Sequence, residues 1–185
     1  MPSDQTIARS LHDLGAAAWF GGSLMAVTAL PAASRAVPDP RERMLVADAG
    51  WQAWRPWRAA MLAAHVAGSL SLLWGNKGRL AAQEGAMTVN LAKTGVTLAA
   101  LAADVYAAML GRRIGAHQPV AVTSELEPSP ETPDEVAALQ RKLRMVQWTV
   151  PVLTGANLVL SAKMGEQQRP VNVATGLLSR VALRA

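Results

Sequence analysis

Long apolar stretches without any charge divide the chain into segments. Residues 14–33 form a run of twenty, 59–75 a run of seventeen interrupted only by His65, and 145–162 a run of eighteen. A fourth stretch, at about residues 88–110, has a comparable length but contains two charges. Because roughly 20 apolar residues are needed for a helix to cross a bilayer, the pattern predicts an all-α bundle of four transmembrane helices.

We place these spans at about residues 11–33, 57–75, 88–110 and 143–164, within a single membrane domain that covers residues 1–185. The alternative is a soluble helical bundle rich in alanine. A surface helix of a soluble protein has a polar face, and residues 14–33 show none. We therefore expect a multi-pass membrane protein.

The segment after the first span combines tryptophan with arginine. Asp39 followed by Pro40 suits a helix start, with the aspartate as N-cap. The helix that follows carries Trp51, Trp54, Trp57, Arg55 and Arg58. These residue types favour the headgroup layer, so we expect an interfacial helix anchored by them and in contact with anionic lipid. Aromatic and basic residues also bind single-stranded nucleic acid, but the apolar span that follows argues against that partner.

Two polar segments flank the fourth span. Residues 115–132 include an acidic, proline-rich stretch that is typical of a mobile loop. Thr132, Pro133 and Glu135 match a capping box, so a helix should begin there and continue into the span. Residues 171–185 carry apolar side chains on one helical face and basic and polar side chains on the other. This amphipathic helix is expected to lie on anionic lipid or to pack on a partner subunit.

Charged and polar residues also fall inside the predicted spans. An unpaired charge at mid-span costs about 2.5–3.5 kcal/mol on insertion scales, so partners should exist. Matching the depths of the spans predicts two intramembrane pairs, Asp13 with Lys93 and His65 with Asp104, while Asn157 completes a polar interior. These pairs either hold the helices together or form a proton or ion relay.

The composition limits the available chemistry. The chain has 185 residues, no cysteine, three histidines and a formal net charge of +5. Disulfides and thiolate metal sites are excluded, and the histidines have few carboxylates near them, so no metal site is expected. Haem ligation by His12 and His65 is disfavoured, because their expected depths differ by roughly 10 Å. No catalytic or nucleotide-binding motif is present, so we expect neither a cofactor nor catalysis.

Two stretches carry a resemblance to known proteins. "LHDLGAAAWFGGSLMAV", residues 11–27, followed by "DPRERMLVADAGWQAW", residues 39–54, resembles small four-helix membrane proteins of unknown function from actinobacteria. The resemblance covers roughly the first 80 residues. It implies the plasma membrane of a bacterium, and it supplies no activity and no site residues.

Taken together, these features favour an accessory, assembly or scaffolding subunit of a bacterial membrane protein complex. Its expected partners are membrane lipids, including anionic lipid, and other membrane subunits or further copies of itself. The competing class is a small oligomeric transporter or channel that uses His65 and Asp104 as a relay. An enzyme acting on lipid or quinone is a third class.

Overall fold

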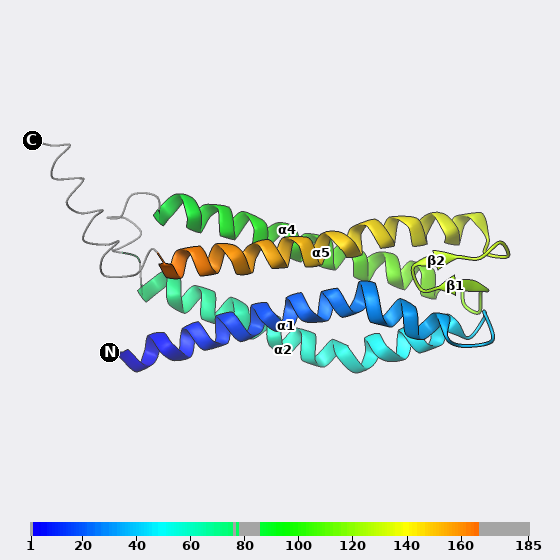
Figure 1. The fold of residues 1–185 in the computed structure, drawn as a ribbon, viewed down its shortest axis with the longest axis horizontal. Helices are drawn as coiled ribbons and strands as arrows, with labels where there is room; N and C mark the ends of the chain where they lie inside the picture. Colours follow the sequence, from blue (N-terminus) through cyan, green and yellow to red (C-terminus); the bar gives the residue numbers. More distant parts are fainter. Residues whose placement is uncertain (1, 76, 78–85, 167–185) are drawn as a thin grey trace, which may run out of the picture.

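Four long helices lie side by side along the molecule (Figure 1). The computed structural model describes residues 2–75, 77 and 86–166. The helices are α1 (Pro2–Arg35), α2 (Arg43–Gly75), α4 (Ala86–Gly115) and α5 (Asp134–Glu166). A short hairpin of β1 (Val122–Ser124) and β2 (Glu127–Pro128) lies between α4 and α5 at the end away from the N-terminus (Figure 1). The predicted all-helical bundle is therefore confirmed; the predicted tail 171–185 lies outside the described residues.

Three of the described helices are long and apolar enough to cross a membrane. They include residues Gln5–Arg35, Met87–Gly115 and Asp134–Lys163, which correspond to the first, third and fourth predicted spans. The second predicted span, in α2, does not belong to this set. His65 interrupts its apolar run and Arg58 directly precedes it, so a stretch of spanning length is less apolar in α2 than in the other three helices.

The structure shows no separate interfacial helix among the described residues that follow α1. The tryptophan and arginine segment is instead the first half of α2, which continues through Pro56 to Gly75. This half packs along α1 because small residues allow close approach: a Cβ on Gly22 would lie 2.5 Å from the ring of Trp54. Gly50 faces Leu30 of α1 in the same way.

These contacts set the register of α2 against its neighbours. Gly15 of α1 lies against Met61 and His65, and Leu30 lies against Gly50, so the charge-free run 14–33 runs beside about residues 45–64 of α2. Phe20 of α1 faces Gly155 of α5. This contact places residues 14–33 of α1 beside the charge-free residues 145–162 of α5. The apolar run of α2 is therefore displaced by roughly three helical turns, and the charged first half of α2 lies level with apolar parts of its neighbours.

The segment 115–132, predicted to be a mobile loop, is a packed cap over one end of the bundle. Val122 and Leu126 are buried in a core with Ile114, Val136 and Leu143. Arg43 donates hydrogen bonds to the carbonyls of Val122 and Thr123. The acidic, proline-rich composition of the segment predicted a mobile loop, but its few apolar residues pack into the core and hold the hairpin against the bundle.

The cap also fixes the start of α5. The helix begins at Asp134, close to the predicted start. The hydroxyl of Thr132, however, donates to the carbonyl of Ala121 at 2.6 Å and accepts from the backbone N–H of Ser129 at 2.8 Å. It therefore ties the helix start to the hairpin.

Candidate functional site

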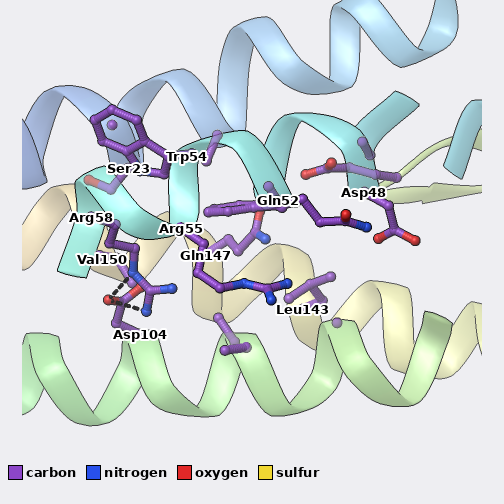
Figure 2. A pocket seen from close by; sticks show the side chains of 18 of the residues that line it. Ser23, Asp48, Gln52, Trp54, Arg55, Arg58, Asp104, Leu143, Gln147 and Val150 are labelled. Atoms are coloured by element: carbon purple, nitrogen blue, oxygen red, sulfur yellow. Dashed lines mark hydrogen bonds and ion pairs between the residues drawn. The ribbon is translucent and has the colours of Figure 1, made fainter. Parts of the chain in front are cut away.

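A cavity of about 580 Å³ lies between the helices, and the cap contributes to its wall. Its polar lining consists of Ser23, Asp48, Gln52, Arg55, Arg58, Asp104, Arg112, Glu125 and Gln147. Aromatic and aliphatic side chains, among them Trp19, Trp51 and Trp54, form the rest of the wall. Figure 2 shows side chains of α2 directed across this space toward α4. The charged residues of α2 that lie level with apolar neighbours therefore face an internal space.

The packing of the helices leaves this space open on one side. α1 packs extensively on α2 and on α5, and α4 packs on α5, whereas α2 and α4 make no extensive contact. Arg58 and Asp104 link these two helices. The Nη2 and Nε atoms of Arg58 lie 2.6 and 3.0 Å from Oδ2 of Asp104. Both side chains are largely buried, at 22% and 13% exposed, so the pair bridges α2 and α4 inside the bundle rather than at its surface.

This pair corrects the predicted pairing of His65 with Asp104. The prediction started the second membrane helix at residue 57, so it placed His65 near the surface that Asp104 approaches. Because α2 begins at Arg43, His65 lies further from the cap, toward the N-terminal end of the bundle. Arg58 lies at the level of Asp104 instead. Arg58 was predicted to be a headgroup anchor; it is an internal partner.

Glu125 is a buried acid in the cavity wall, 3% exposed. Neither carboxyl oxygen has a hydrogen bond of normal geometry with any described residue. Burial raises the pKa of Glu125 to about 8; Asp48 adds to this rise, and the indole of Trp51 opposes it. Glu125 is therefore protonated at neutral pH and offers both a donor and an acceptor to the cavity.

The amide of Gln147, 7% exposed, adds a second unused polar group. Its Oε1 atom is buried without a partner in the described part of the chain. Buried polar atoms are nearly always hydrogen-bonded in proteins, so these groups are typical of a site that holds a ligand or ordered water. Neither residue was predicted to belong to a site, because an isolated acid in a polar stretch, such as Glu125, and a single amide in an apolar run, such as Gln147, give no periodic signal.

A second polar cluster lies toward the N-terminal end of the bundle. Lys93 Nζ lies 2.6 Å from His12 Nε2, and His12 Nδ1 lies 2.6 Å from Asp13 Oδ1. An ammonium group can only donate, so His12 accepts at Nε2 and donates from Nδ1 to Asp13. The predicted pair of Asp13 and Lys93 is thus joined through His12 rather than directly.

His65 belongs to this cluster. Its Nδ1 atom donates to the carbonyl of His12 at 3.0 Å, and the two imidazole rings lie 4.5 Å apart. The Nε2 atom of His65 is buried and has no partner among the described residues. The predicted depth difference between His12 and His65 is therefore wrong, for the same reason of register.

The remaining predicted residues are divided between these regions. Asn157, 1% exposed, donates to the hydroxyl of Thr97 at 3.0 Å and so contributes to a polar interior. Trp51 and Trp54 line the cavity, whereas Trp57 is 62% exposed, as an interface anchor would be. Trp19 of the cavity wall lies close to the carboxylate of Asp104, although no hydrogen bond of normal geometry joins them.

The histidines are not arranged as a metal or haem site. Within residues 2–75, 77 and 86–166, no group of three or more metal-ligating side chains is positioned to hold an ion. Both ring nitrogens of His12 are already engaged, and its ring lies against that of His65. The pair therefore does not present two free nitrogens on opposite sides of a porphyrin.

Comparisons of the chain with family models, with curated proteins and with solved structures find no match. The fold and the cavity thus define a helical bundle with three helices apolar enough to span a membrane and a charged internal cavity.

Proposed function

We propose that this protein is a small membrane transporter or carrier that binds an amphipathic molecule in the cavity between its helices. The carrying observation is the 580 Å³ cavity, whose wall includes the buried, unpartnered polar groups of Glu125 and Gln147. Ligand sites typically have volumes of about 300–1,000 Å³, apolar walls and a few placed polar groups. Charged residues at membrane depth generally face such a functional cavity.

The histidine cluster supports transport in addition to binding. Hydrogen bonds link the side chain of Lys93 through the ring of His12 to Asp13, whose side chain is 56% exposed, and the ring of His65 packs against that of His12. Titratable groups linked in this way inside a membrane favour a proton relay. The relay proposed here is that of Lys93, His12 and Asp13, in place of the predicted pair of His65 and Asp104.

A ligand screen on the purified full chain in neutral detergent tests the binding function. Amphipathic ligands should raise the unfolding temperature of the wild type. Ala108→Trp, which fills the cavity, should abolish that rise, whereas Val105→Trp, on the exposed side of the same helix, should retain it. Equal stabilisation of both variants contradicts binding in the cavity, and a ligand that binds is then tested for pH-driven uptake into liposomes.

A second candidate is an accessory or scaffolding subunit of a bacterial plasma membrane complex. The open side between α2 and α4 favours it, because a helix of another subunit or of a second copy would cover the exposed Arg55 and Arg112 there. Affinity purification in mild detergent with mass spectrometry separates the candidates. A stoichiometric larger complex supports the accessory subunit, and the isolated chain or its homo-oligomer supports the transporter.

A further inference from the structure

The charges that remain uncompensated indicate what the cavity binds. Asp104 is neutralised by Arg58, and Asp48 accepts a hydrogen bond of 2.7 Å from Nε2 of Gln118. Glu125 is protonated at neutral pH because burial raises its pKa to about 8. Of the three acids of the wall, Asp104 is paired, Glu125 is neutral, and Asp48 keeps a negative charge that is solvated by the amide of Gln118.

The arginines of the wall differ from the acids. Neither Arg55 nor Arg112 forms an ion pair or a side-chain hydrogen bond within the part of the chain that the structure describes. Two guanidinium groups at one cavity favour an anion, since each can donate two parallel hydrogen bonds to a carboxylate or a phosphate.

The two arginines line the same cavity from different helices, Arg55 from α2 and Arg112 from the C-terminal end of α4. In Figure 2, Arg55 extends from α2 toward Leu143 of α5. Arg112 lies in the last turn of α4, which ends at Gly115 where the cap begins. The anion-binding groups therefore lie near the cap, level with the ends of the apolar runs. Toward mid-bundle Trp19, Trp54 and Leu62 form the wall around the mutually neutralised pair of Arg58 and Asp104.

This polarity along the cavity matches the shape of an amphiphile, with a charged head at the membrane surface and an apolar body deeper in the bilayer. The gap between α2 and α4 is the side on which packed helices leave the cavity accessible. The buried Glu125 and Gln147 provide hydrogen bonds for polar atoms of the body or the head.

We propose that the occupant is an amphipathic anion, a carboxylate or phosphate on an apolar body, which enters from the lipid between α2 and α4 and pairs its headgroup with Arg55 and Arg112. This inference rests on the proposed function, and it narrows the substrate class from amphipathic molecules in general to anionic ones.

Tryptophan quenching tests it, because Trp19, Trp51 and Trp54 line the cavity. The probe is 9,10-dibromostearic acid, added at pH 7.5 to the full chain in neutral detergent, with its methyl ester as the uncharged control. The acid should quench saturably and at least about tenfold more tightly than the ester. Arg55→Gln with Arg112→Gln should remove that preference, whereas Arg113→Gln, the exposed neighbour that does not line the cavity, should keep it.

The outcomes separate the two levels of the proposal. Displacement of the acid by lysophosphatidic acid, but not by lysophosphatidylcholine, supports an anion with a phosphate head; resistance to both lipids supports a carboxylate. Equal affinity for acid and ester, or an unchanged preference in the double arginine variant whose unfolding temperature is normal, overturns the anionic ligand and leaves the cavity function standing. Absence of saturable quenching by either probe overturns both.

Discussion

The two faces of α2 show opposite solutions to helix packing. On the face toward α1, glycines bring the helices into backbone contact: a Cβ on Gly68 would lie 2.5 Å from the backbone nitrogen of His12, and one on Gly15 would lie 2.6 Å from the carbonyl oxygen of Met61. On the face toward α4, the helices stand apart around a cavity, and Arg58 and Asp104 bridge the gap. One helix is thus fixed on one side and left open on the other.

The difference explains how α2 can carry charges beside apolar neighbours. Small residues on one face allow close packing of helices in lipid, where the hydrophobic effect provides little driving force. That packing fixes the depth of α2 and leaves its arginines on the other face, directed into the cavity (Figure 2). The glycine contacts supply stability, and the open face supplies the polar groups.

The largest effect is expected from placing a side chain in the tight contact between α1 and α2. Gly68→Leu should prevent close packing of α1 on α2, because the new side chain meets backbone atoms of Ala8 and His12 that cannot move aside. Overpacking typically costs about 1–3 kcal/mol, and we expect more than about 3 kcal/mol here. Thermal unfolding in detergent measures it, with Gly21→Leu as control, since a Cβ at Gly21 meets nothing within 4 Å. Equal losses in both variants would contradict the packing.

The next largest effect is expected from the buried acid Glu125 in the cavity wall, which should make stability depend on pH. In the unfolded chain Glu125 titrates near its ordinary pKa of 4.5, whereas in the folded chain its pKa is about 8. Between these values the folded state holds the proton and the unfolded state does not, so stability falls as pH rises, by about 1.4 kcal/mol per pH unit. From pH 6 to 8 the wild type should therefore lose roughly 2–3 kcal/mol relative to Glu125→Gln.

Denaturant unfolding of both proteins at pH 6, 7 and 8 measures this difference. Glu131→Gln is a suitable control, because Glu131 is exposed. A constant difference in the free energy of unfolding between wild type and Glu125→Gln across this range would show that Glu125 is not protonated in the folded protein.

The sequence predicts some helices of the bundle better than others. Long apolar stretches predict α1, α4 and α5 well, because length and apolar composition alone define a possible span. They misplace α2, whose depth is set by contacts of Gly15, Gly22 and Gly68 with α1 rather than by hydrophobicity. From that error follow the predicted interfacial helix and the predicted pair of His65 and Asp104.

The candidate site was recovered in part for the same reason. Asp104, Lys93 and Asp13 were recognisable as charges that need partners, but the identity of each partner depends on register, and Arg58 was predicted to be a headgroup anchor. Glu125 lies in a stretch whose composition predicts a mobile loop, and only the packing of the hairpin buries it. Sequence patterns thus identify which residues require a partner, whereas tertiary contacts decide which partner they find.

The ion pair that bridges α2 and α4 should have an intermediate effect. Asp104→Asn or Arg58→Met leaves a largely buried polar group without its partner, and each should cost about 2 kcal/mol, less than the about 3–5 kcal/mol of a fully buried pair. The double variant should lose little more than either single variant. A double-mutant cycle measures this coupling, and the cycle of Asp104→Asn with His65→Ala should be additive. Strong coupling between His65 and Asp104, with no coupling between Arg58 and Asp104, would show that the register of α2 described here is wrong.

The smallest effect is expected for an ion pair outside the bundle, which serves as a reference for the one inside it. Arg35 Nη2 lies 2.6 Å from Oε2 of Glu127, and the two side chains are 48% and 37% exposed. Water and salt screen such a pair, so the cycle of Arg35→Ala with Glu127→Gln should give a coupling of at most about 0.5 kcal/mol. Raising the salt concentration to about 1 M should remove this coupling, because the Debye length falls to about 3 Å, but should leave most of that between Arg58 and Asp104. If salt weakens both couplings alike, water reaches the inner pair freely, and the gap between α2 and α4 is as open to solvent as the surface of the cap.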